Sequence, residues 1–313
     1  MWRPGNNSMS KILVIGDIML DRFVFGDVHR LSQEAPVPVV RFTRDDYRIG
    51  AAANVAANCA SLGAPVTLIG FTGNDDCADI IFDLLKGANI NAFILTDPSI
   101  KTTQKLRVIG RSQQIVRVDF EQRPNASITA KAIEQIALHD VIVLSDYDKG
   151  ALVDVRLMIQ HAKKLGKTVI VDPKGYDYSK YSGADLVKPN IDEMLKMAGG
   201  WTDEDQLKAK AEKLRQDAGI GAILLTRAGD GMTLYDGGMH HIHAKAKEVY
   251  DVTGAGDTVM AAFSVMLSHG RTLLEAAVIA NYAAGVVVGK FGTATVSIDE
   301  LREAMNGTHE SNQ

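Results

Sequence analysis

The sequence has little cysteine, no strong charge of one sign and no long apolar run. Its two cysteines, Cys59 and Cys77, lie in apolar stretches of helical character, away from other potential metal ligands. We therefore expect both to be buried, reduced thiols, which suits a cytoplasmic protein. The formal net charge of −4 over 313 residues gives no reason to expect a nucleic acid or an anionic membrane as partner. No apolar run approaches the roughly 20 residues that cross a bilayer.

Two further patterns are missing. Residues 1–10 are polar, include Pro4 and Gly5 and lack the apolar core of a signal peptide, so we expect a disordered leader there. The first apolar run is not followed by a Gly-x-Gly-x-x-Gly motif. This absence argues against a dinucleotide-binding fold, and so against a nicotinamide-dependent dehydrogenase.

Short apolar runs alternate with helical stretches from residue 11 onward. Each run contains β-branched residues and is followed by a polar cluster: Lys11–Ile15, Val141–Leu144, Thr168–Val171, Leu186–Val187 and Ala222–Leu225. Strands that alternate with helices predict an α/β fold with a mostly parallel central sheet and helices on both faces. In such a sheet, ligands bind at the carboxyl ends of the strands, where these polar clusters lie.

Two segments interrupt this alternation with pairs of half-exposed strands. In residues 22–49 and 101–120, the strands are expected over Arg22–Val28, Val37–Phe42, Thr102–Ile109 and Gln114–Phe120. They are expected to form a small sheet outside the main one. The second pair carries four basic residues, Lys105, Arg107, Arg111 and Arg117. These residues form either a solvated basic hairpin or a lid whose cations meet an anionic substrate.

The stretch Asp251–Thr258, Asp-Val-Thr-Gly-Ala-Gly-Asp-Thr, leads into an apolar helix. Gly254, Ala255 and Gly256 have almost no side chain, so an anion can approach the N–H groups at the helix N-terminus. Asp257 places a carboxylate beside the same pocket. A carboxylate next to a phosphate is repulsive, but it is useful if it accepts the proton of a hydroxyl group that attacks the phosphate. The motif alone is equally typical of an ordinary helix start.

An alanine-rich helix is expected over Gly50–Leu62, with two asparagines on one face. Asn54, in the first turn near Gly50, is well placed to meet a ligand. Asn58, one turn later, is expected to be a surface or packing residue.

Two later strands end in motifs that suit a nucleotide. Asn190 and Glu193 occupy the N-cap and N3 positions of a helix, so one interpretation is a plain capping box. The other places Asn190, Asp192 and Glu193 near nucleotide phosphates. Glu193 would then contact magnesium through water, because Mg²⁺ prefers oxygen ligands and keeps several waters. Thr226 and Gly229 lie in the turn after the next strand and form either a tight turn or a phosphate contact.

A zinc site is conceivable at His241 and His243, which share one face of a predicted hairpin. No third ligand accompanies them. Surface histidines are therefore the favoured interpretation.

Together these motifs resemble the ribokinase-like (PfkB) family of carbohydrate kinases. The matches occur in the family's order and span nearly all the chain: Gly16-Asp17, Gly50–Asn54, Asn190 with Glu193, Thr226-Arg227 with Gly229, and Asp251–Asp257. The resemblance implies a ribokinase-like domain over residues 11–313, with a lid sheet from residues 22–49 and 101–120. It also implies a kinase that uses ATP with Mg²⁺ and forms a homodimer through the lid.

A closer resemblance is to the bacterial kinases of D-glycero-β-D-manno-heptose 7-phosphate. It rests on Gly16–Asp21, Glu34–Val39, Lys105–Val108, Leu144–Tyr147, Asp172–Gly175 and Glu248–Thr253. It implies phosphorylation at O1 to the 1,7-bisphosphate, for ADP-heptose and lipopolysaccharide core synthesis. Because the chain ends soon after Glu300, it resembles the kinase-only form rather than the form fused to an adenylyltransferase. One departure is Gly50-Ala51, where the family usually has two glycines, and the extra methyl group could narrow the sugar approach.

The resemblance also assigns roles position by position. Asp257 is the base that takes the proton from O1, and the N–H groups of Gly254 to Gly256 stabilise the transferring phosphoryl group. Asp17 and Asn54, with Gly50 beside them, hold sugar hydroxyls. The residues that bind the nucleotide and its magnesium are Asn190, Asp192, Glu193, Thr226, Gly229 and Asn281. Asp251 and Thr253 match positions that bind a monovalent cation such as K⁺.

A phosphorylated substrate also needs cations. The candidates are Lys105, Arg107, Arg111, Arg117 and Lys174, and the sequence does not rank them.

Two rival functions stay open. A kinase for another phosphosugar, such as fructose 6-phosphate, would share Asp257 and the glycine turn. A sugar-phosphate-binding protein without activity would share the fold alone. An intact base and glycine turn favour a kinase.

Overall fold

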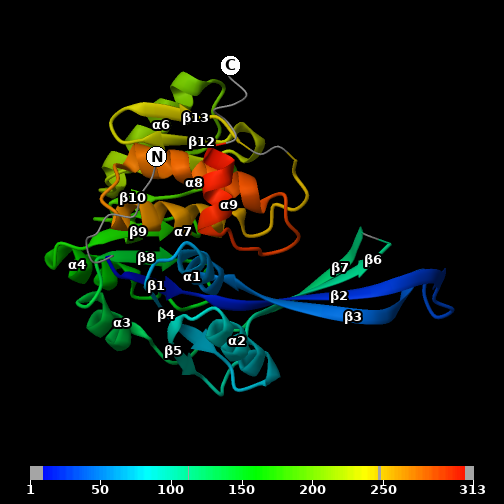
Figure 1. The fold of residues 1–313 in the computed structure, drawn as a ribbon. Coiled ribbons are helices and arrows are strands. Elements are labelled where there is room, and N and C mark those ends of the chain that lie inside the picture. Colours follow the sequence, from blue (N-terminus) through cyan, green and yellow to red (C-terminus); the bar gives the residue numbers. More distant parts are fainter. Residues whose placement is uncertain (1–9, 112, 246–247, 307–313) are drawn as a thin grey trace.

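The structure is a computed structural model that describes residues 10–111, 113–245 and 248–306. The expected leader lies outside these residues, apart from Ser10. A large sheet with helices forms the body, and a second sheet extends from it as an arm (Figure 1). None of the helices in the described part of the chain has the length and apolar character needed to cross a bilayer.

The large sheet contains nine strands within the described residues, in the order β13-β12-β11-β10-β9-β8-β1-β4-β5. Neighbouring strands are parallel except at β11–β12 and β12–β13. In chain order the strands are β1 (Ile12–Gly16), β4 (Val66–Thr72), β5 (Asn91–Thr96), β8 (Val141–Ser145), β9 (Thr168–Asp172), β10 (Leu186–Val187), β11 (Ile223–Thr226), β12 (Met232–Tyr235) and β13 (Met239–Ile242). The predicted mostly parallel sheet is confirmed.

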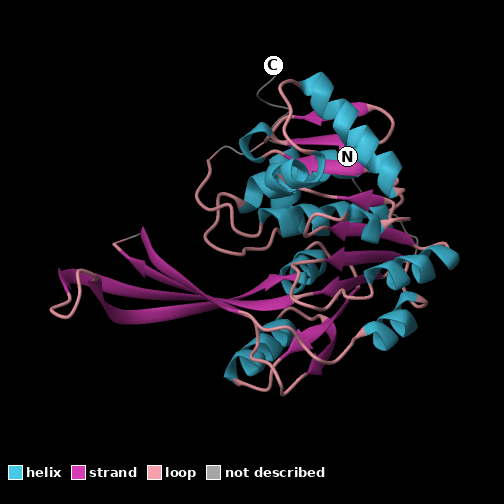
Figure 2. Cartoon of the chain, turned by 180° about the vertical axis from the view of Figure 1, so that it is seen from behind, coloured by secondary structure: helices cyan, strands magenta, loops and turns pink. Residues whose placement is uncertain are grey.

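Helices cover both faces of this sheet (Figure 2). In β1, Ile12 and Val14 face one apolar cluster, while Leu13 and Ile15 face the other. The first cluster includes residues of α1 (Ala52–Ser61), α2 (Asp76–Gly87), α7 (Ala255–Ser268), α8 (Leu273–Val287) and α9 (Ile298–Asn306). The second includes residues of α3 (Thr129–Ile136), α4 (Val155–Lys164) and the 3₁₀ turn η1 (Tyr178–Tyr181). A third, smaller cluster packs α5 (Ile191–Ala198) and α6 (Glu204–Ala218) against β11 and β12.

The arm is a four-stranded sheet in the order β3-β2-β6-β7. Its strands are β2 (Ile18–Leu31), β3 (Pro38–Ala51), β6 (Gln104–Gly110) and β7 (Gln113–Phe120). We call this sheet the lid. The two predicted pairs of strands therefore meet in one sheet, as expected, with β2 parallel to β6.

Two lid strands are much longer than predicted. β2 and β3 continue from the tip of the lid to its base, where Ile18 pairs with Ala51. The alternation of apolar residues fades in the charged part of β3, but cross-strand contacts such as the Arg22–Asp45 ion pair (2.9 Å) hold the pairing there. Helix α1 consequently begins at Ala52 rather than Gly50, and the lid joins the body beside Asp17.

The two cysteines differ in exposure. Cys59 is buried in α1, as expected, and burial raises the pKa of its thiol. Cys77 is only half-buried, so that expectation is wrong for Cys77. It lies at the base of the lid, where Nε2 of Gln104 donates to its sulfur atom (3.2 Å).

Candidate active site

The glycine turn adopts a conformation that only glycine accepts easily. Gly254 has φ 77° and ψ 2°, and a Cβ atom there would lie 2.7 Å from Nδ2 of Asn54. The N–H of Ala255 donates to a carbonyl oxygen within the turn (3.2 Å). The N–H groups of Gly256 and Asp257 have no acceptor among the described residues. These two groups, at the positive end of α7, can receive an anion.

Asp257 is the buried carboxylate of this site, 3% exposed. Its Oδ2 accepts a hydrogen bond from Nδ2 of Asn54 (2.9 Å), and its Oδ1 accepts one from the hydroxyl of Tyr147 (2.7 Å). Burial raises the pKa of Asp257 to about 6, although both hydrogen bonds and the charge of Lys188 act in the opposite direction. A carboxyl group with this pKa is largely ionised at neutral pH and still accepts a proton readily.

Asn54 and Asn58 join α1 to α7. Oδ1 of Asn54 accepts from Nδ2 of Asn58 (3.1 Å), which leaves the Asn54 amide group oriented toward Asp257. Oδ1 of Asn58 in turn accepts from Thr258 Oγ1 (3.3 Å) and from the N–H of Val296 (3.2 Å). Asn58 is fully buried, so the surface alternative for it is wrong and the packing alternative is right.

Asp17 follows β1 and lies in a different environment. Its carboxylate accepts hydrogen bonds from the backbone N–H groups of Tyr147 (2.8 Å), Lys149 (3.0 Å) and Ala151 (3.0 Å). Burial raises the pKa of Asp17, while these three bonds oppose the rise. A carboxylate accepts about four hydrogen bonds, so room for a sugar hydroxyl is limited to about one more. The predicted sugar contact of Asp17 stays a prediction.

The capping box expected at α5 is present. Oδ1 of Asn190 accepts from the N–H of Glu193 (2.8 Å), and Oε2 of Glu193 accepts from the N–H of Asn190 (3.0 Å). The other carboxylate oxygen of Glu193 accepts from Nζ of Lys174 (2.9 Å). Lys174 thus lies at the Glu193 end of the site, and Asp192 is exposed in the same turn.

The other candidates for a nucleotide lie around β11 and α8. Thr226 forms a bridge with Asn190, and Gly229 lies in the 3₁₀ turn η2 (Ala228–Asp230) that follows. Asn281 is buried on α8, and its Nδ2 donates to the His243 carbonyl oxygen (2.7 Å). The Asn281 amide is therefore partly used within the protein.

The predicted cation loop connects two segments beside the glycine turn. Asp251 accepts from the N–H of Thr253 (2.9 Å) through Oδ1 and from the N–H of Gly292 (2.8 Å) through Oδ2. Although burial opposes it, these bonds lower the pKa of Asp251. The neighbouring Thr293 hydroxyl is buried and has no hydrogen-bond partner among the described residues. A buried oxygen without a partner suits a cation ligand.

The lid carries its basic residues at different distances from the glycine turn. Strand register places Lys105 opposite Asp21, and Arg107 opposite Phe23, on the same face of the lid. Nη1 of Arg107 lies 2.5 Å from Oδ1 of Asp21, a carboxylate close enough to act on the pKa of Asp257. This pair therefore lies at the site.

Two other lid arginines have partners other than Asp21. Arg111 is at the exposed tip, where its Nε donates to the Val28 carbonyl oxygen (2.8 Å). Arg117 is on the outer strand β7, half-exposed and paired with Asp119 (2.9 Å). Register nevertheless pairs Arg117 with Arg107, one strand farther from Asp21, whereas Arg111 lies in the turn beyond β6.

Sequence reasoning missed three residues near Asp257. They are Tyr147, which donates to Asp257, Lys188, whose charge acts on it, and Asp172, which pairs with Lys188 (3.0 Å). Tyr147 follows β8, Asp172 ends β9 and Lys188 follows β10. Each belongs to a polar cluster after a predicted strand, which was the available signal. Their partners are distant in sequence, so only the order of the strands brings them together.

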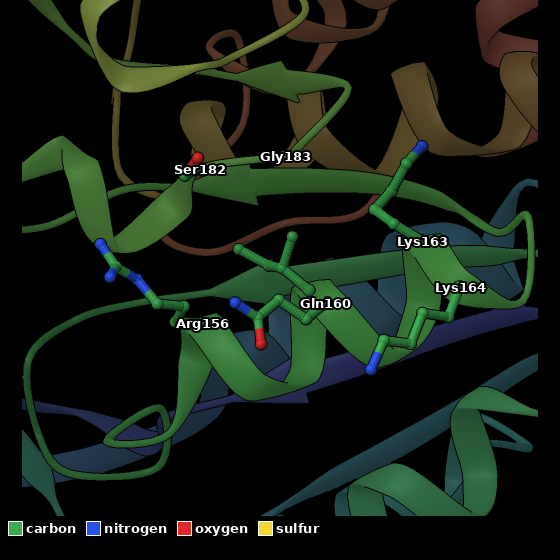
Figure 3. A pocket seen from close by; sticks show the side chains of 7 residues that line it. Arg156, Gln160, Lys163, Lys164, Ser182 and Gly183 are labelled. Carbon is green, nitrogen blue, oxygen red and sulfur yellow. The ribbon is translucent and has the colours of Figure 1, made fainter.

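Two features lie apart from this site. His241 and His243 stack edge to face with ring centroids 4.5 Å apart, and the described residues contain no cluster of metal ligands. A surface hollow of about 570 Å³ lies along α4, which is on the opposite face of the sheet from α7. Its basic side chains, Arg156, Lys163 and Lys164, point away from one another (Figure 3).

Comparison with known sequences places the chain among sugar kinases. Residues 9–301 match the model of the pfkB family carbohydrate kinases. The D-beta-D-heptose 7-phosphate kinase of Bordetella bronchiseptica is 48% identical over 93% of this chain and 95% of its own length. The bifunctional protein HldE of Ectopseudomonas mendocina is 47% identical over 94% of this chain. That match spans 63% of HldE.

Solved structures support the same fold at low sequence identity. Arabidopsis thaliana ribokinase, complexed with ribose and ATP, gives a TM-score of 0.80 at 19% identity, covering 95% of this chain and 99% of that one. Escherichia coli phosphofructokinase-2, in complex with potassium, gives a TM-score of 0.80 at 19% identity, covering 96% and 100%. The ribokinase-like fold class is confirmed.

Proposed function

Since this chain belongs to the pfkB family of carbohydrate kinases, we propose that it phosphorylates D-glycero-β-D-manno-heptose 7-phosphate at O1 with ATP. The observation that carries the reaction type is the buried carboxylate of Asp257 next to the free N–H groups of the glycine turn. The substrate is supported by the 48% identical relative, which is named for a heptose 7-phosphate. The product is the 1,7-bisphosphate, an intermediate suited to ADP-heptose and lipopolysaccharide core synthesis in the cytoplasm.

Asp257 takes the proton from O1 as that oxygen attacks the γ-phosphorus of ATP. The bond between this phosphorus and the bridging oxygen breaks, and ADP leaves with the electron pair. The N–H groups of Gly256 and Asp257 face the negative charge that develops on the phosphoryl oxygens. Asn54 and Tyr147 hold the two carboxylate oxygens in place, so the base is oriented before the sugar arrives.

The nucleotide lies toward Asn190, Asp192, Glu193, Thr226, Gly229 and Asn281 in this proposal. Glu193 fits a role toward Mg²⁺, because one of its carboxylate oxygens is paired with Lys174, whose side chain is 42% exposed. The ion, when bound, neutralises charge on the phosphate groups. Lys174 is then free to meet those phosphates, so we assign it to the nucleotide rather than to the sugar phosphate.

A monovalent cation such as K⁺ is proposed at Asp251 and Thr253. The buried Thr293 hydroxyl without a partner supports this site, as does the potassium complex of the structurally similar phosphofructokinase-2. A cation there would fix the loop that precedes the glycine turn.

Among the basic candidates for the sugar phosphate, we favour Arg107 and Lys105 over Arg111 and Arg117. The first two lie on β6, the strand next to Asp21, whose charge reaches Asp257. Arg117 is one strand farther out and paired with Asp119, and Arg111 lies in the turn beyond β6. The opposite face of the lid exposes Val116, Val118 and Phe120, and we propose that this face pairs two subunits into a dimer.

The test is ATP consumption with a panel of phosphosugars, with the product examined by phosphorus NMR. Selective turnover of the heptose 7-phosphate with a new anomeric phosphate is expected. Turnover of fructose 6-phosphate alone would retain the mechanism and refute the heptose assignment. Binding of sugar phosphates without any turnover would refute the kinase assignment.

A further inference from the structure

A stack of side chains joins one face of the lid to the body of the protein. Strand register places Phe23, Arg48 and Arg107 on that face. The guanidinium carbon of Arg107 lies 5.1 Å from the centre of the Phe23 ring, and the Phe23 ring centre lies 4.9 Å from that of Phe291. Phe291 belongs to residues 288–297, which connect α8 to α9 and which we call the α8–α9 loop. The lid therefore packs directly on this loop.

Arg48, on β3, holds the same loop through its backbone. Its Nη1 donates to the carbonyl oxygen of Phe291, and its guanidinium carbon lies 5.2 Å from the centre of the Phe291 ring. Nη2 and Nε of the same group donate to Oδ2 of Asp46 (3.1 and 3.3 Å). A planar guanidinium group that is held through all three of its nitrogens has a fixed orientation. Arg48 thus fixes the α8–α9 loop relative to the lid.

The α8–α9 loop also borders the glycine turn. The N–H of Gly292 donates to Oδ2 of Asp251 (2.8 Å), and a Cβ atom at Gly254 would lie 3.0 Å from Cγ2 of Thr293. Because protein interiors are densely packed, contacts this close do not allow one segment to move without the other. A shift of the lid at Phe291 therefore reaches, within two residues, the turn that carries the free N–H groups.

We propose that Arg48 is a positioning residue, which couples the lid to the glycine turn through the α8–α9 loop, so that a sugar phosphate bound beneath the lid strengthens the binding of ATP. The inference deepens the proposed function and rests on it, because it needs an enzyme with two substrates, but it does not depend on the identity of the sugar. Arg48 acts through the loop and touches neither substrate. By linkage, ATP strengthens the binding of the sugar phosphate by the same factor.

The alternative is a contact that only supports the fold. Arg48→Met removes the guanidinium group but keeps most of the side-chain stem, and the arginine side chain is 27% exposed, so the variant is expected to fold. Phe291→Leu keeps the carbonyl oxygen and an apolar side chain but removes the ring. Arg22→Met is the matched control. Arg22 pairs with Asp45 (2.9 Å) in the same two lid strands and lies on the opposite face from Phe23.

The experiment measures the affinity of a non-hydrolysable ATP analogue with Mg²⁺ by calorimetry, with and without a saturating phosphosugar. The phosphosugar is the one that the wild type turns over, so a wrong heptose assignment leaves the measurement intact. In the wild type and in Arg22→Met, the phosphosugar should tighten binding of the analogue by about fivefold or more. In Arg48→Met the gain should fall below about twofold, with the affinity for the analogue alone unchanged. Phe291→Leu should give an intermediate gain.

Kinetics and thermal unfolding give the second readout. At saturating phosphosugar, Arg48→Met should raise KM for ATP by about fivefold and change kcat by less than about threefold. A full gain in affinity retained in Arg48→Met, with or without a loss of thermal stability, would overturn the proposal. A wild type whose affinity for the analogue does not respond to the phosphosugar would overturn it as well.

The failure of the proposed function has a different signature. Absence of turnover with every phosphosugar would refute the kinase assignment. The coupling would then be measured with the phosphosugar that binds most tightly, and the same two results would decide the role of Arg48.

Discussion

Asp17 and Asp257 are both aspartates buried at the edge of the same sheet, 4% and 3% exposed, and burial raises the pKa of each. They differ in the groups that donate to them. Asp17 accepts three backbone N–H groups, whose positions are fixed by the chain. Asp257 accepts two side-chain donors, Asn54 and Tyr147.

The difference separates a carboxylate that fixes a loop from one that can react. A backbone N–H group has a fixed direction and can only donate, so Asp17 must stay ionised and bonded to the segment after β8. A tyrosine hydroxyl can rotate and accept, so the environment of Asp257 tolerates a change in its protonation state. Burial alone therefore does not distinguish the two aspartates, whereas burial with adaptable donors supports the proposed role of Asp257 as the base.

The largest expected effect is on turnover in Asp257→Asn. Removing the proton acceptor should lower kcat by about 10³-fold. The free energy of unfolding at pH 8 should equal or exceed that of the wild type, because the amide carries no buried charge and Tyr147 can accept from its NH₂ group. Steady-state kinetics and urea denaturation measure the two quantities. Near-normal turnover would remove Asp257 from the role of base.

The same replacement at Asp17 should have its main effect on stability. In Asp17→Asn the side-chain NH₂ group must face at least one of the backbone N–H groups of Tyr147, Lys149 and Ala151. Both groups are hydrogen-bond donors, so that hydrogen bond is lost. We expect the free energy of unfolding to fall by about 2 kcal/mol, measured by urea denaturation. Unchanged stability would show that the backbone bonds do not define this carboxylate.

A smaller effect is expected when one donor to Asp257 is removed. Tyr147→Phe deletes a hydrogen bond that lowers the pKa of Asp257, so this pKa should rise. Since the base must be ionised, the fall of kcat/KM at acid pH should begin about half a pH unit higher. Asp21, Asp172 and Lys188 also act on this carboxyl group, and they stay in place. Tyr176→Phe, at an exposed position, is the matched control and should leave the profile unchanged.

The smallest effect concerns the base of the lid beside Asp17. Ala51 has φ 54° and ψ −131°, a conformation that favours glycine and strains alanine. Ala51→Gly should therefore raise the free energy of unfolding by about 1 kcal/mol. Ala57→Gly, within α1, should lower it by about 1 kcal/mol or more, because it weakens a regular helix in the core. Thermal unfolding of both variants tests the contrast in sign.

The sequence predicts the fold well because its signals are local. Apolar runs with polar ends predicted the parallel strands, and the contiguous motif Asp251–Thr258 predicted the glycine turn at the start of α7. The lid strands were underestimated because β3 is charged on both sides near Asp45, and only pairing with β2 keeps it extended.

The contacts within the site could not be predicted in the same way. Tyr147 reaches Asp257 across 110 residues, and Lys188 meets Asp172 only because β9 and β10 are neighbours. Lys174 was grouped with the lid cations by charge alone, yet its ion pair with Glu193 places it at the other end of the site. Charge and residue type do not specify partners when the chain connection between them is long.

The most direct test of the account is the pH dependence of phosphoryl transfer in the wild type and in Asp257→Asn. The wild-type kcat/KM should fall about tenfold per pH unit below a pH near the pKa of Asp257, which burial raises to about 6. The residual rate of Asp257→Asn should show no such fall over the same range. An unchanged acid limb in Asp257→Asn would contradict the assignment of Asp257 as the base.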